Sequence, residues 1–162
     1  MYLSYNKNKQ IILPALLSFA LIVFQGYLPS INLSGGFIVT CDLFFIYLTY
    51  LALNKELYKI IIFAFIFGIF QDLVIQPETI GLYAFIKVVS VFLINYLNKV
   101  KNLWNEIISI VYLFSIYFFH YLLYHFVFIG EFSFTLLIYI IVESVLNLII
   151  FIICDKIFLR TG

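Results

Sequence analysis

The chain has 162 residues, of which 65% are hydrophobic and only 10% are charged, and its mean hydropathy is +1.16. A soluble domain of this size is about half apolar and about a quarter charged, so this composition excludes an ordinary soluble domain and predicts an integral membrane protein. The formal net charge of +1, without a basic run, argues against nucleic-acid binding, and the two cysteines are too few for a disulfide framework or a zinc ligand set.

Six apolar stretches are long enough to cross a membrane as helices, which takes about 17 to 25 residues. Each stretch is continuously apolar, whereas the strands of a membrane barrel alternate between polar and apolar residues. The sequence therefore predicts an all-α integral membrane protein, a compact bundle that forms one domain over residues 1–162. The six predicted transmembrane helices cover residues 11–28, 36–53, 58–75, 80–97, 106–129 and 134–158.

The basic residues predict the orientation of the bundle. Eight of the nine lie on one side of the predicted spans: Lys7, Lys9, Lys55, Lys59, Lys99, Lys101, Lys156 and Arg160. The opposite loops, at 29–35, 76–79 and 130–133, contain no Lys or Arg and include Glu78 and Glu131. Because basic loops stay in the cytoplasm, both termini are predicted to be cytoplasmic.

Four charged residues remain inside the apolar stretches. An ionised side chain at a helix centre costs about 2.5 to 3.5 kcal/mol to insert, so such residues usually face the interior of a bundle and indicate function. Three further polar side chains lie inside the apolar stretches. Asn147 lies one turn after Glu143 in the sixth span, and His120 and His125 lie in the fifth. The sequence predicts a partly hydrated polar cluster in the outer half of the membrane. Its members are Asp42, Asp72, Lys87, Glu143, Asn147, His120 and His125.

Within this cluster Lys87 is predicted to pair with one or more of Asp42, Asp72 and Glu143. Asp72→Ala is predicted to strand Lys87, at a cost of about 3 to 5 kcal/mol if that pair is buried and dry. The alternative is that the charges only fix helix register, since buried ion pairs are poor evidence of net stabilisation.

Small residues predict where helices approach closely. Ala64 and Gly68 precede Asp72 at intervals of four residues, so they share one face of the third span and suit tight contact with a neighbouring helix. Gly81 lies at the start of the fourth span and is a third candidate for close packing.

No catalytic, cofactor-binding or metal-binding residue is predicted. The chain has no nucleophile motif, no glycine-rich phosphate loop and no HExxH motif. His120 and His125 are five positions apart, about 140° around a helix, so they do not share a face as metal ligands at i and i+4 would. The prediction is therefore a protein that is not an enzyme and carries no cofactor.

Two segments resemble the rod shape-determining protein MreD family. Residues 41–53 resemble the family's Pro-Asp-Leu run followed by leucines, Tyr and Ala-Leu, with Cys41 in place of the proline. A second set of positions is similar to the family's Gly-x-x-x-Asp motif and to the Leu-Gly and small residue that follow it. Ile80 stands in place of that leucine. These positions are Phe65, Gly68, Asp72, Leu73, Gly81 and Ala84.

The resemblance implies a non-enzymatic scaffold subunit of the bacterial elongation machinery in the inner membrane. Members of that family bind MreC and act with MreB, RodA, a class B penicillin-binding protein and RodZ in lateral peptidoglycan synthesis and cell shape. The family's fold is similar to the substrate-binding subunits of energy-coupling vitamin transporters. Such a transporter subunit is the alternative function, and a membrane enzyme that acts on lipid-linked substrates is the third.

Overall fold

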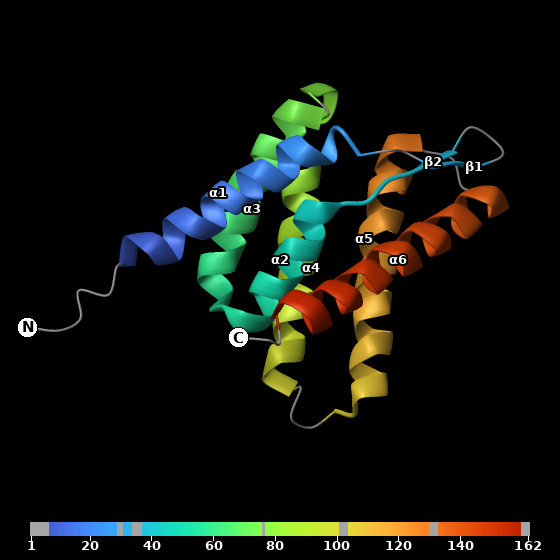
Figure 1. Cartoon of the computed structure of the whole chain (residues 1–162). Coiled ribbons are helices and arrows are strands. Elements are labelled where there is room, and N and C mark those ends of the chain that lie inside the picture. The colour runs from blue at the N-terminus through green and yellow to red at the C-terminus, as the bar shows by residue number, and fades with distance from the viewer. Residues whose placement is uncertain are drawn as a thin grey trace, which may run out of the picture.

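The computed structural model describes residues 7–28, 31–33, 37–75, 77–100, 104–129 and 133–159. Helix α1 (Lys7–Gln25) leads into a hairpin of two three-residue strands, β1 (Ile31–Leu33) and β2 (Phe37–Val39), which pair antiparallel. Five helices follow (Figure 1), with a 3-10 turn η1 (Pro77–Thr79) between the second and third of them and a π turn (Asp155–Leu159) after the last. They are α2 (Leu43–Asn54), α3 (Leu57–Ile75), α4 (Leu82–Val100), α5 (Glu106–Ile129) and α6 (Phe134–Cys154).

Four of these helices, α3 to α6, are long and apolar enough to cross a membrane. The prediction of a helical membrane protein is confirmed to that extent. The apolar part of α1 (Ile12–Gln25) and the whole of α2 are shorter. The 12 residues of α2 rise only about 18 Å as an α-helix, well short of the roughly 30 Å of hydrocarbon.

The prediction of one helix over residues 36–53 is wrong. Within that stretch β2 comes first, and the helix begins only at Leu43 because Asp42 caps it. The Asp42 carboxylate accepts a hydrogen bond from the backbone N–H of Phe45 at 2.9 Å, which satisfies one of the free donors at the helix start.

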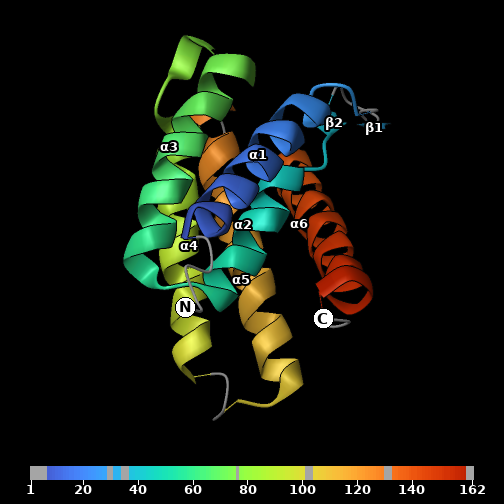
Figure 2. The same ribbon diagram turned by 60° about the vertical axis from the view of Figure 1, so that its left-hand side comes forward.

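Helix α2 lies at the centre of the bundle, and most of its side chains are buried. It packs against α1, α3, α4 and α6 (Figures 1 and 2). Helices α1 and α6 run obliquely to α3, α4 and α5, so α5 and α6 diverge toward the end of the bundle where α4 ends and α5 begins.

Helices α3 and α4 pack against each other at a glycine contact. A Cβ atom added at Gly68 would lie 2.5 Å from the Cα of Ala84, so only glycine permits this approach. Ala64 is fully buried one turn earlier on the same face of α3. The turn into α4 uses Gly81 at φ +98°, a conformation that residues with a side chain rarely adopt.

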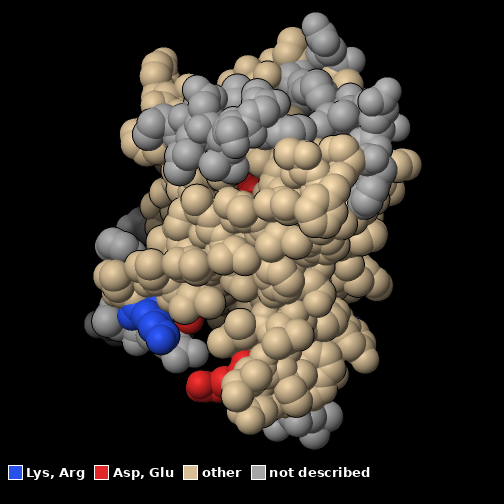
Figure 3. Space-filling view, turned by 90° about the vertical axis from the view of Figure 1, so that its right-hand side faces the viewer, with Lys and Arg blue, Asp and Glu red and all other residues tan. Residues whose placement is uncertain are grey.

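The outer surface is largely apolar. Large side chains such as Phe65, Phe85 and Phe126 are more than half exposed on three different helices, as expected where lipid replaces water. On the face in Figure 3 most of the visible charged atoms gather at the lower end of the molecule, around a hollow.

Candidate functional site: a buried polar cluster

The centre of the cluster is an ion pair between Lys87 of α4 and Asp42 at the start of α2. Lys87 is fully buried and Asp42 is 4% exposed. The ammonium group also lies 5.4, 5.3 and 5.3 Å from the ring centroids of Phe44, Phe45 and Tyr83. Since one carboxylate oxygen of Asp42 binds Lys87 and the other caps α2, a single side chain both neutralises the lysine and starts the helix.

Asn147 joins α6 to the segment that enters α2. Its side-chain oxygen accepts the backbone N–H of Asp42 at 2.9 Å. Its amide nitrogen donates to the backbone carbonyls of Thr40 at 3.2 Å and Glu143 at 3.0 Å. This one amide therefore satisfies backbone groups of residues 40 and 42 that the α2 helix leaves unpaired.

A second side-chain contact of the cluster joins α5 to α6. His125 Nε2 and Glu143 Oε2 lie 2.9 Å apart and share a hydrogen bond. The other carboxylate oxygen of Glu143 accepts from the hydroxyl of Thr40 at 3.4 Å. Glu143 thus contacts both α5 and the residues just before α2.

His120 occupies the interface of α2, α4 and α5. Its Nδ1 is 2.9 Å from the hydroxyl of Ser90, and its ring stacks on Phe45 with 3.8 Å between the ring centroids. One turn earlier in α5, the Tyr117 hydroxyl lies 3.0 Å from that of Thr49. The two hydrogen bonds, His120 with Ser90 and Tyr117 with Thr49, therefore join α5 to α4 and to α2.

Asp72 does not pair with Lys87. Its carboxylate accepts the backbone N–H groups of Gly81 at 2.8 Å, Tyr83 at 2.9 Å and Ala84 at 3.4 Å. These donors lie at the start of α4, where N–H groups have no partner within the helix. The prediction that removing Asp72 would strand Lys87 is therefore wrong, because Asp42 binds the lysine and Asp72 caps α4.

The predicted polar cluster is enclosed by protein among the described residues. All seven predicted cluster members are buried, and protein groups supply the hydrogen bonds described above. No group of three or more His, Cys, Asp or Glu side chains among the described residues is placed to hold a metal ion. The cluster is a closed network that links α2, α4, α5 and α6.

Some members of this network were not predicted from the sequence. Thr40 and Thr49 have no distinguishing pattern, since threonine is ordinary in apolar helices. Asn95 of α4 donates to the carbonyls of Ala52 and Lys55 at 2.8 and 3.0 Å and so closes the end of α2. Asn95 is a polar amide within the fourth apolar stretch, and this position could have indicated that its side chain faces the interior of the bundle.

No protein-family model, curated protein or solved structure matches this chain.

Proposed function

We propose that this protein is a scaffold subunit of the bacterial cell-elongation complex, of the MreD type, and that it holds MreC and the rest of that machinery at the cytoplasmic membrane. The proposal starts from the two segments that resemble the MreD family. We also propose that α1 and α2 lie in the membrane together with α3 to α6, so that one domain contains six membrane helices.

The observation that carries the proposal is the role of the residues on which the resemblance depends. Asp42 starts α2 and binds Lys87, Asp72 starts α4, and Gly68 allows α3 to contact Ala84. All of them determine the shape of the bundle. A scaffold needs a fixed shape that partners can recognise, and a buried, hydrogen-bonded polar network supplies one.

The proposed orientation places both ends of the chain in the cytoplasm. The α2–α3 turn, with Lys55 and Lys59, and the ends of α4 and α6, with Lys99 and Lys156, lie toward the same end of the molecule (Figure 1). The positive-inside rule assigns this end to the cytoplasm. The hairpin and the α3–α4 turn then face outward, toward the extracytoplasmic part of MreC.

The alternative, a vitamin-binding transporter subunit, requires a ligand pocket that opens outward. In the proposed orientation the outer half of the bundle holds the closed polar cluster, whose members are buried against one another. The geometry of the described residues therefore favours the scaffold over the transporter subunit.

The test is depletion of the protein in the bacterium that encodes it, combined with recovery of its partners. We expect rods to become spheres as the protein is lost, and a tagged copy to recover MreC from membranes. A Glu56→Gln variant is the matched control and should restore rod shape, because the ion pair of Glu56 with Lys59 lies on the exposed surface at the α2–α3 turn.

Unchanged cell shape after full depletion would contradict the proposal. Unchanged shape with loss of uptake of one vitamin would instead support the transporter subunit. Recovery of MreC without a change of shape would support membership of the complex and contradict a role in determining cell shape.

A further inference from the structure

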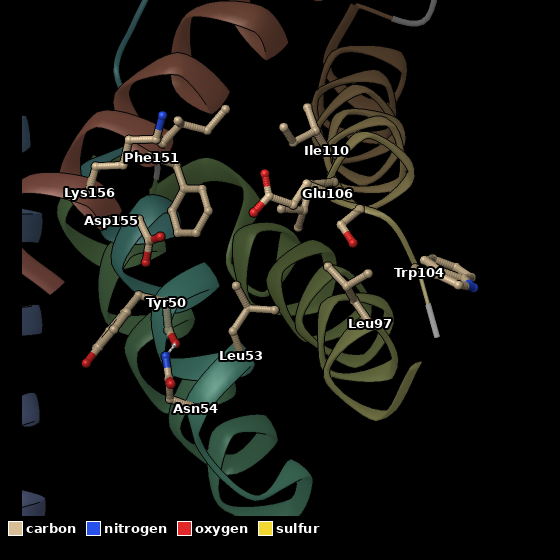
Figure 4. Close-up of a pocket in the computed structure, with 13 residues that line it drawn as sticks. Tyr50, Leu53, Asn54, Leu97, Trp104, Glu106, Ile110, Phe151, Asp155 and Lys156 are labelled. Carbon is tan, nitrogen blue, oxygen red and sulfur yellow. Dashed lines mark hydrogen bonds between the residues drawn. The ribbon is translucent and has the colours of Figure 1, made fainter. Parts of the chain in front are cut away.

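A cavity of about 580 Å³ opens at the basic end of the bundle, away from the polar cluster. It lies between the end of α2, the end of α4, the start of α5 and the end of α6 (Figure 4). Helices α5 and α6 diverge at this end of the bundle (Figures 1 and 2). Figure 3 shows a hollow between charged atoms at this lower end of the molecule.

One side of the cavity is apolar and continuous with the surface that faces lipid. Leu53, Leu97, Leu113 and Phe151 form its inner wall. Ile110 lines the cavity and is also 44% exposed on α5, so it belongs to both surfaces. A hydrocarbon chain in the bilayer therefore reaches the cavity laterally without crossing a polar barrier.

The lining of the cavity also carries charge of both signs. Glu106 projects from the first turn of α5, and Asp155 and Lys156 follow the end of α6. Glu106 lies on the α5 wall, and Asp155 and Lys156 lie across from it on the α6 wall (Figure 4); the three side chains have a net formal charge of −1. Trp104 and Tyr50 also line the cavity, and such aromatic side chains prefer the boundary between hydrocarbon and water.

We propose that this cavity binds one phospholipid whose headgroup carries a primary amine, as phosphatidylethanolamine does. The ammonium lies toward Glu106, the phosphate toward Lys156 on the opposite wall, and an acyl chain along Ile110 to the bilayer. The charge pattern disfavours an anionic headgroup, because two carboxylates repel it. It also disfavours a choline headgroup, which has no N–H to donate to them.

This inference does not depend on the proposed function, because it uses only the cavity and its lining. The full-length protein is placed in nanodiscs that contain equal amounts of phosphatidylethanolamine, phosphatidylglycerol and phosphatidylcholine. The lipid that stays bound after release into detergent is then counted by native mass spectrometry. We expect one phosphatidylethanolamine to stay bound per chain. It should be enriched about tenfold over either competitor, because one charge-assisted hydrogen bond changes affinity by about that factor.

Two pairs of variants locate the site. Glu106→Gln should lower retention of phosphatidylethanolamine about tenfold, whereas Glu56→Gln at the α2–α3 turn should not change it. Ser109→Trp fills the cavity without changing its charge and should abolish retention. Ser115→Trp, on an exposed position of the same helix, is its control and should retain the lipid.

Equal retention of the three lipids, or a preference for phosphatidylglycerol, would overturn the proposal. Unchanged retention in Ser109→Trp would also overturn it, because the lipid would then lie elsewhere. A photo-crosslinker at position 109 that captures a protein in membranes, and no lipid, would assign the cavity to a peptide partner instead. Thermal unfolding of each variant shows that a loss of lipid does not reflect a loss of fold.

Discussion

Replacing Asp42 should destabilise the bundle more than replacing any other charged residue. Asp42→Ala leaves the ammonium of the fully buried Lys87 without its carboxylate, which costs about 3 to 5 kcal/mol. The same substitution removes the cap of α2, which adds about 1 kcal/mol. Asp42→Asn keeps a capping oxygen and removes only the charge, so it should lose about 3 to 5 kcal/mol and be milder than Asp42→Ala.

The assay is equilibrium unfolding in mixed micelles, with Lys87→Met as the second arm of a double-mutant cycle. Asp42→Asn combined with Lys87→Met removes both charges and should recover at least about 2 kcal/mol relative to the sum of the single variants. If the two single effects add to within about 0.5 kcal/mol, the residues do not interact and the ion pair has no energetic role. Equal stability of Asp42→Ala and Asp42→Asn would refute the capping role.

The remaining predictions concern α3 and α4. Gly68→Ala should lower the unfolding free energy by about 1 to 3 kcal/mol, because its new Cβ overlaps Ala84; Gly26→Ala, whose Cβ finds ordinary contacts, should be close to neutral in the same titration. Asp72→Ala should lose about 1 to 3 kcal/mol by leaving N–H groups at the start of α4 unpaired, and its effect should add to that of Lys87→Met. Strong coupling between residues 72 and 87 would show that Asp72 also stabilises the lysine.

Hydropathy alone gave much of the helical architecture. The predicted span at 106–129 coincides with α5, and the spans at 58–75 and 80–97 differ from α3 and α4 by one to three residues. These limits are predictable because each helix coincides with a long apolar run that ends at a polar or helix-breaking residue.

The second span was not predictable in the same way, because a hydropathy average treats a strand and a helix alike. Residues 37–39 form β2, and their apolar side chains merged with those of α2 into one apparent span. Asp42 was the overlooked signal. Aspartate is a preferred capping residue, and here it precedes the residues that form α2.

The membership of the polar cluster was easier to predict than its pairing. Helical spacing shows which side chains share a face of one helix, and it placed Glu143 with Asn147 correctly. It does not give the depth or rotation of one helix against another. Those depend on contacts such as that of Gly68 with Ala84, and they decide that Asp42 faces Lys87 while Asp72 faces the start of α4.

The bonds of Asn147 have a consequence for biogenesis. The amide binds backbone groups of Thr40 and Asp42, which precede it by more than 100 positions, so the start of α2 lacks these partners until α6 has left the ribosome. Helix α2 is also too short to cross the bilayer alone. A nascent chain that ends before α6 therefore leaves the centre of the bundle incomplete, and insertion of the last helix completes the assembly of the first half.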